Sequence, residues 1–383
     1  MANNYEKEIS SLYNQYAKPF TADIMEQLGV QFALVSANLS NFLPTIPVTD
    51  HERFYRNILL HQQLSLMDEI MPADAMQHII IENESGFNFS LLKQAPAIFC
   101  TIHLGSYRLI NYFLKKNYIP FALVANRNII LKESERFNRN FEKYHVENGH
   151  SLQIIDAEES TSAIKMIRAL KQGVSLLIYM DGNTGAGIPA NQNLCTIDFL
   201  AQQLAVRSGI AYMSIKTKTP IIPLVSYRTD RFANNLRFLP SVLSSFEIVD
   251  EKAAIQRTMQ QLYNQISQAI IKYPYQWEAW LYLHKSAKIT PANYANINKS
   301  NNDTSQIAFN SHEFAIFKIN TRSFLLQKNT YSSCLIDEAL FDFLSSCLPF
   351  HLGDITIAPG LLTTLFNKRI IIPADSNICS SLK

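Results

Sequence analysis

Residues 97–108 read AIFCTIHLGSYR, an apolar run that stops at a histidine and a glycine. Such a run is typical of a strand in a parallel sheet that is covered on both faces. Residues 109–114, LINYFL, then predict a helix. His103 is therefore expected at the carboxyl end of a strand, in the turn before a helix, where open α/β sheets bind their ligands. A histidine there can take a proton from a hydroxyl or an amine near neutral pH.

The alternation of strand-like and helix-like runs continues on both sides of this stretch. The strand-like runs are 97–102, 120–124, 152–155, 174–180, 221–226 and 234–243. The helix-like runs are 106–116, 134–148, 161–171, 207–216 and 251–272. This order predicts an α/β fold with a central, mostly parallel sheet flanked by helices.

The ends of the chain differ from this middle part. Residues 1–95 read mostly as helices, at 6–16, 20–39 and 50–68, and form a helical N-terminal lead. Residues 286–311 are rich in Asn, Ser, Thr and Lys, which is typical of a linker. Beyond them we predict a small α+β module, with strands at 314–319, 323–326 and 369–372 and helices at 335–347 and 359–366. The predicted domains are 1–285 and 312–383, which we expect to fold separately.

Composition narrows the class of protein. Among 383 residues, 47% are hydrophobic and the net charge is +2, so the chain as a whole gives no case for nucleic-acid binding. The five cysteines lack metal-ligand spacing, which favours a reducing, cytoplasmic compartment and no metal site. Residues 1–20 lack the apolar core of a signal peptide, and no run approaches the roughly 20 apolar residues of a membrane span. We expect a protein that is soluble or peripheral at the inner membrane.

Five stretches follow one another along residues 101–280. They are TIHLGSYR at 101–108, VANRN at 124–128, a segment from Asp181-Gly182 through DFLAQ at 198–202 to VRSGIA at 206–211, TPIIPL at 219–224, and YPYQWEAW at 273–280. Together they resemble the lysophospholipid acyltransferase superfamily, most closely the bacterial lipid A lauroyl/myristoyl acyltransferases. The resemblance covers residues 1–285. It implies transfer of a fatty acyl group from an acyl carrier protein or coenzyme A thioester to a hydroxyl or amine of a lipid, glycolipid or peptide, with no cofactor besides the donor.

The resemblance also implies roles for the matching residues. His103 corresponds to the histidine of the family's His-x4-Asp/Glu motif and would be the general base that deprotonates the acceptor. Gly105 matches the glycine two residues after it, and Arg127 and Asn128 match the family's basic stretch. We expect these three residues and Arg108 to bind substrate. Arg127 would stabilise the oxyanion or hold a phosphate.

Two stretches depart from the family pattern. Arg108 stands where the motif has an acid, and residues 199–202 read FLAQ where the family has Phe-Leu-Gly-Arg. Arginine cannot accept a hydrogen bond and disfavours a protonated neighbour. Asp181, which ends the predicted strand 174–180, is the expected replacement acid beside His103, with Arg108 turned toward the pocket mouth. The alternative is a catalytically silent relative that binds an acyl chain or a carrier protein.

Several residues also have structural interpretations. A strand-end histidine is often structural, Asp181 fits a turn cap, and Arg127 fits a solvated surface. Residues 182–187, GNTGAG, lack the Gly-Lys-Ser/Thr ending of a phosphate-binding loop and favour a flexible loop. Trp277 and Trp280 have the helical spacing of core residues.

The C-terminal module allows a different acceptor. Residues 312–373 resemble the small winged-helix modules that accompany peptide-modifying enzymes. A strand pair followed by a helix could add a strand from a bound leader peptide. The acceptor would then be a peptide amine or hydroxyl, and a purely structural role for the module stays open as the alternative.

Overall fold

The computed structural model describes most of the chain, in two compact units. The described residues are 4–83, 86, 89–93, 95–127, 130, 153–182, 193–243, 250–290, 306–346, 350–351 and 358–374. The first unit consists of Met1–Lys18, Arg56–Phe199 and Leu204–Ala279. The second consists of Pro19–Tyr55, Leu200–Gln203 and Trp280–Lys383.

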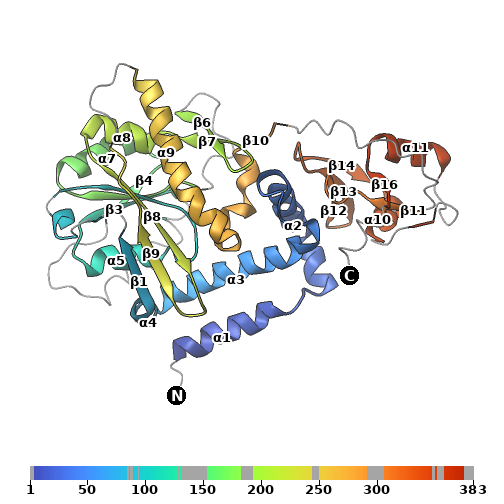
Figure 1. Cartoon of the computed structure of the whole chain (residues 1–383), viewed down its shortest axis with the longest axis horizontal. Coiled ribbons are helices and arrows are strands. Elements are labelled where there is room, and N and C mark those ends of the chain that lie inside the picture. The colour runs from blue at the N-terminus through green and yellow to red at the C-terminus, as the bar shows by residue number, and fades with distance from the viewer. Residues whose placement is uncertain are drawn as a thin grey trace. The chain divides into compact units, whose positions relative to one another are not determined.

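A seven-stranded sheet forms the centre of the first unit (Figure 1). Its strands, in spatial order, are β1 (Ile79–Asn83), β9 (Asn234–Phe238), β8 (Ile221–Arg228), β2 (Ile98–Thr101), β5 (Ser175–Tyr179), β3 (Phe121–Ala125) and β4 (Gln153–Asp156). β8 and β9 pair antiparallel, and every other neighbouring pair in this sheet is parallel. The predicted fold class, a mostly parallel sheet flanked by helices, is confirmed.

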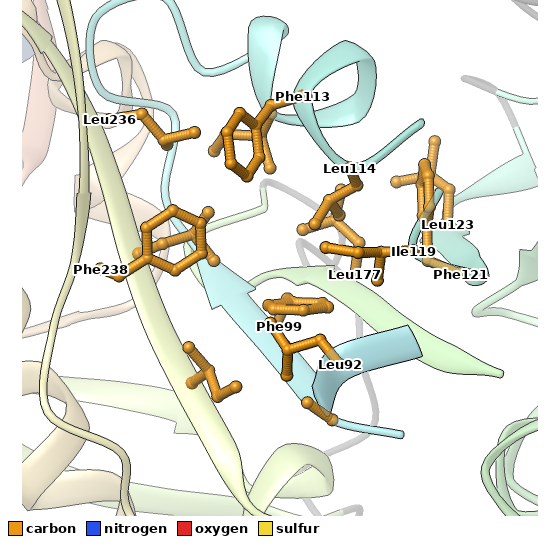
Figure 2. Packing of buried hydrophobic residues seen from close by; sticks show 14 of the residues in the cluster. Leu92, Phe99, Phe113, Leu114, Ile119, Phe121, Leu123, Leu177, Leu236 and Phe238 are labelled. Carbon is orange, nitrogen blue, oxygen red and sulfur yellow. The ribbon is translucent and has the colours of Figure 1, made fainter. Parts of the chain in front are cut away.

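Helices cover both faces of this sheet. On one face, Phe99 of β2, Leu177 of β5 and Phe238 of β9 pack with Phe113 and Leu114 of α5 (Leu109–Lys116), as Figure 2 shows. Residues that alternate with these along the strands point to the opposite face. There α7 (Ser162–Lys171) contacts β4 and β5, α8 (Gly209–Thr217) contacts β2 and β8, and α9 (Glu251–Lys272) contacts β8. Both faces are therefore buried, which is why the strands read as continuous apolar runs.

The first unit also contains α1 (Asn4–Ala17), residues 56–70 of α3 (His51–Ile70) and the short α4 (Pro72–Ala75). Tyr5 and Ile9 of α1 pack with Leu64 of α3 and with Leu109 and Tyr112 of α5. This contact brings the C-terminal turn of α3 next to the turn that carries His103, and so places the end of α3 at the site.

The second unit combines an N-terminal helix with the C-terminal module. Its antiparallel sheet has the order β12 (Phe314–Ile319), β13 (Arg322–Gln327), β14 (Ser332–Ile336). A second small sheet has the order β15 (Phe350–His351), β11 (Gln306–Phe309), β16 (Ile371–Pro373), and the module's helices are α10 (Glu338–Ser345) and α11 (Pro359–Asn367). Ala33 and Ala37 of α2 (Ala22–Phe42) pack on Phe317 and Leu326 of the first of these sheets.

This packing draws a boundary that the sequence does not show. The predicted domain 1–285 includes residues 19–55, whereas the contacts group those residues with the C-terminal module. The reason is that part of the apolar face of the β12–β14 sheet is covered by α2, a segment far away in sequence. In the predicted linker 286–311, residues 291–305 lie outside the described part, while β10 (Ala287–Lys288) and β11 form strands. Separate folding of 312–383 stays a prediction.

Other differences are local. β1 lies in the stretch read as mostly helical, and β6 (Leu194–Phe199) and β7 (Gln202–Arg207) were not predicted as strands. The predicted helix 335–347 begins instead with the end of β14, because Asp337 caps α10 and the helix starts only at Glu338. The predicted helix 134–148 lies outside the described residues. The short 3₁₀ turns are Val48–Asp50, Met76–His78, Leu91–Lys93, Pro274–Gln276, Glu278–Leu281 and Leu283–Lys285. Within the described residues, no helix is both long enough and apolar enough to cross a membrane.

Candidate active site

His103 and Asp181 meet at the carboxyl ends of two adjacent strands. β2 ends two residues before His103, β5 ends two residues before Asp181, and the two strands pair in parallel. The His103 Nδ1 atom lies 2.7 Å from Asp181 Oδ1. The contact predicted from the sequence between these two side chains is present.

The Asp181 carboxylate is held by further N–H donors. The backbone N–H of His103 donates to Oδ1 at 3.2 Å and to Oδ2 at 3.0 Å. The indole Nε1 of Trp277 donates to Oδ2 at 2.7 Å. All these contacts use the carboxylate oxygens as acceptors, which assigns the proton of the neutral His103 ring to Nδ1 and the lone pair to Nε2. Nε2 is the nitrogen that a general base needs.

Two tyrosines pack against the imidazole. The Tyr107 ring lies edge-on with its centroid 4.7 Å away, and the Tyr179 ring lies at 4.9 Å. The His103 side chain is 16% exposed, so water screens it only weakly. Burial lowers the pKa of His103, but the charge and hydrogen bond of Asp181 raise it, with help from Glu278 and against Arg108. The net pKa of His103 lies above the ordinary value for histidine.

Arg108, the departure from the family motif, is neutralised from α3. Its Nε lies 3.0 Å from Glu69 Oε2, and its Nη1 donates to Ser65 Oγ at 3.1 Å. Its guanidinium carbon also lies 4.6 Å from the centroid of the Tyr107 ring. The guanidinium is thus engaged by Glu69 and Tyr107. These contacts fix its partners, and its predicted direction toward a pocket mouth stays a prediction.

The residue before Glu69 anchors the same turn. Asp68 accepts hydrogen bonds from Ser106 Oγ and, at 2.6 Å, from Tyr5 Oη. It also forms a buried ion pair with Arg228 at 2.6 Å. Asp68 and Glu69 are both fully buried. The last turn of α3 therefore supplies two carboxylates to the segment 103–108, one to Ser106 and one to Arg108.

The segment Tyr273–Glu278 holds the other side of this turn. Leu104 and Trp277 form an antiparallel bridge, and the Glu278 N–H donates to the His103 carbonyl at 2.9 Å. The Gln276 side chain donates to the Arg228 carbonyl and accepts from the Arg228 N–H, both at 2.8 Å. The family-like stretch 273–280 therefore holds the turn that carries His103 in place. Within it, Trp277 is both a core residue and a hydrogen-bond partner of Asp181.

Gly105 has a structural explanation. Its φ is +54°, and a Cβ there would lie 2.7 Å from the Ser226 carbonyl oxygen and from Tyr227 Cα on β8. Its N–H donates to the Gln276 carbonyl at 3.0 Å. Only glycine fits this approach, and its donor is already used. The structure thus gives a packing reason for glycine at position 105, and the predicted contact of Gly105 with substrate stays a prediction.

Arg127 lies on the same edge of the sheet, farther from His103. It follows β3, the second strand from β2, and its Nε lies 3.4 Å from Asp156 Oδ2 at the end of β4. The side chain is 71% exposed, so Arg127 remains accessible to a ligand. Asn128 and the loop 183–187 lie outside the described residues.

A comparison with known protein families identifies the family of this chain. A family model described as bacterial lipid A biosynthesis acyltransferase matches residues 50–288. The chain belongs to this family. It is an acyltransferase, and the resemblance found in the sequence is confirmed.

The other comparisons add less. The chain is similar to the solved structure of the 1-acyl-sn-glycerophosphate (LPA) acyltransferase PlsC from Thermotoga maritima, at 10% identity. That likeness covers 69% of this chain and 93% of the other, with a TM-score of 0.34, and the family assignment does not depend on it. No match was found among curated proteins.

Within this lipid A acyltransferase-like chain, sequence reasoning found His103 and Asp181 but missed four residues of the site: Asp68, Glu69, Trp277 and Glu278. Trp277 lies in the family-like tail, so that motif was an available signal. Asp68 and Glu69 are polar positions at the end of a helix that otherwise packs in the core, and nothing local says which arginine each will meet. The second departure, Ala201-Gln202, lies where β6 turns into β7, with Gln202 Oε1 accepting from the Thr290 N–H at 2.9 Å.

Proposed function

We propose that this chain transfers a fatty acyl group from a carrier thioester to a hydroxyl or amine, with His103 as general base. The observation that supports this most is the 2.7 Å contact between His103 Nδ1 and Asp181 Oδ1. Asp181, which follows β5, supplies the carboxylate that the motif lacks at position 108. A carboxylate on Nδ1 orients the ring and stabilises the imidazolium that forms when Nε2 takes a proton.

The reaction is balanced as a general-base acyl transfer. Nε2 of His103 takes the proton of the acceptor O–H or N–H while that oxygen or nitrogen attacks the thioester carbonyl carbon. The tetrahedral intermediate collapses, the carbon–sulfur bond breaks, and the proton on Nε2 passes to the departing thiolate. The products are the acylated acceptor and a free thiol. The exposed guanidinium of Arg127 is a candidate donor for the oxyanion or for a substrate phosphate.

The donor and acceptor follow from the family's chemistry. The donor would be a thioester of acyl carrier protein or coenzyme A, and no other cofactor takes part. The acceptor would be a lipid or glycolipid, and such an acceptor favours a cytoplasmic enzyme that is peripheral to the inner membrane. The resemblance of residues 312–373 to peptide-recognition modules supports a peptide acceptor as the second candidate.

Intact-mass analysis tests the proposal directly. The purified full chain is incubated with acyl carrier protein thioester or acyl-coenzyme A and with a lipid, a glycolipid or a peptide acceptor. We expect one acceptor to gain the mass of the acyl group, and His103→Ala to abolish that gain while melting near the wild-type temperature. His312→Gln, which changes a histidine of the second unit, serves as the control. Thioester binding without turnover in every combination would favour the catalytically silent relative.

A further inference from the structure

Glu278 lies beside His103, next to the groups described so far. Its carboxylate accepts a hydrogen bond from Tyr107 Oη at 3.1 Å. Its backbone N–H donates to the carbonyl of His103 at 2.9 Å. The backbone of Glu278 is therefore hydrogen-bonded to the backbone of His103, and its side chain is hydrogen-bonded to Tyr107, whose ring packs against the imidazole.

Tyr107 connects this carboxylate with both charged neighbours. The same phenol ring lies 4.7 Å from the His103 ring and 4.6 Å from the Arg108 guanidinium carbon. Arg108 lowers the pKa of His103, so an uncompensated guanidinium here would oppose the positive charge that develops on the imidazole during proton transfer. A second carboxylate next to the same ring reduces that opposition, beyond what Glu69 does from the other side of Arg108.

We propose that Glu278 is a positioning residue that offsets Arg108 at His103, taking over part of the role of the acid that the family motif has at position 108. Asp181 sets the tautomer, and Glu278 keeps the surroundings of the ring negative and holds Tyr107 against it. This inference rests on the proposed function, because it assumes that His103 must accept a proton.

The groups that face His103 come from several elements. Asp181 and Tyr179 come from the end of β5, Tyr107 and Arg108 from the turn before α5, and Glu278 from the tail segment. Burial lowers the pKa of His103, and both carboxylates raise it while Arg108 lowers it. The effects of Glu278 and Arg108 thus have opposite signs, so removing both should nearly restore the original pKa.

Nuclear magnetic resonance titration of His103 tests this without any turnover. The full chain is labelled at histidine, and the His103 resonance is identified by its loss in His103→Ala. We expect Glu278→Gln to lower the pKa of His103 by about one to two units, the Coulomb effect of one charge at roughly 7 Å and an effective dielectric near 20. In the double variant Glu278→Gln/Arg108→Gln, the pKa of His103 should lie within a few tenths of a unit of the wild-type value. Glu251→Gln, a surface acid paired with Lys216 on α8, is the matched control and should change nothing.

The pH profile of kcat/KM gives a second readout. In Glu278→Gln the acid limb should move to lower pH by the same amount, since the limb reports the His103 titration in the free enzyme. An unchanged His103 pKa in Glu278→Gln, alongside a lowered one in Asp181→Asn, would overturn the role of Glu278 and leave the proposed function intact. Full turnover in His103→Ala would instead overturn the proposed function. If Glu278→Gln does not fold, Arg108→Gln alone must raise the pKa of His103, and no rise would refute the offset.

Discussion

Replacing Asp181 by Asn is the sharpest test of the site, because it keeps the shape of the side chain and removes its charge. The carboxylate is 4% exposed, so water cannot take its place. With Nδ1 at 2.7 Å from Oδ1, the centres of the imidazolium and carboxylate charges are about 4 Å apart. At an effective dielectric near 20, their attraction is about 4 kcal/mol, which corresponds to roughly a thousandfold in rate.

The Asp181→Asn substitution also disrupts the hydrogen bonds that the Asp181 carboxylate accepts. Both Asp181 oxygens receive N–H donors, Oδ2 from the Trp277 indole and from the backbone of His103. An amide NH₂ group in either position would face a donor and leave it without an acceptor. We therefore expect kcat to fall about a thousandfold, with little change in the binding of the thioester.

The assay follows thiol release from the donor across pH, using wild type, Asp181→Asn and the surface control Asp342→Asn. Because Asp181 raises the pKa of His103, the acid limb of the variant should move to lower pH while its plateau drops. A shift without loss of rate would show that Asp181 changes the pKa of His103 but does not stabilise the transition state. If Asp181→Asn keeps both the wild-type rate and the wild-type acid limb of the pH profile, the reasoning is refuted and a catalytically silent relative is favoured.

Further expectations concern the frame of the site and the second unit. Trp277→Phe removes one charge-assisted hydrogen bond and should lower kcat by about tenfold to a hundredfold with KM nearly constant in steady-state kinetics. Asp68→Asn breaks a fully buried ion pair and should lower the free energy of unfolding by about 3–5 kcal/mol in urea titration, and a loss below about 1 kcal/mol would contradict the anchoring role. Lys328 directly follows β13 and is buried, and this burial lowers its pKa to about 7. Between pH 7 and its unfolded value near 10.4, the unfolded chain binds more protons than the folded chain. The free energy of unfolding therefore rises with pH in this range, by up to about 1.4 kcal/mol per pH unit. Chemical denaturation at pH 7 and 9 should show this rise in wild type and not in Lys328→Met. Limited proteolysis should cut first within the polar stretch 286–311, because it is poor in large apolar residues. The fragments should co-elute because α2 packs on β12, so separate elution would show that this contact is weak.

Much of the fold could be read from local patterns. The strands β2, β3, β4, β5, β8 and β9 and helix α9 lie where their apolar runs predicted them, with boundaries differing by a few residues. Strand β1 and the pair β6 and β7 were missed, since short runs outside the repeated pattern carry little periodic signal. The edge of the sheet that holds His103 and Asp181 also followed from the sequence, because carboxyl ends of neighbouring parallel strands share one edge.

The sequence by itself determined a buried parallel sheet, the strand-end histidine, its carboxylate partner and the family. It could do so because burial on both faces and short motifs appear as patterns of consecutive residues. Only the tertiary structure decided how Arg108 is tolerated. Glu69 arrives from α3 and Glu278 from the tail segment, 39 and 170 residues away along the chain. Likewise, only packing joined α2 to β12. The sequence shows that a buried charge or an apolar face must have a partner. Which partner it contacts depends on how the folded chain brings distant segments together.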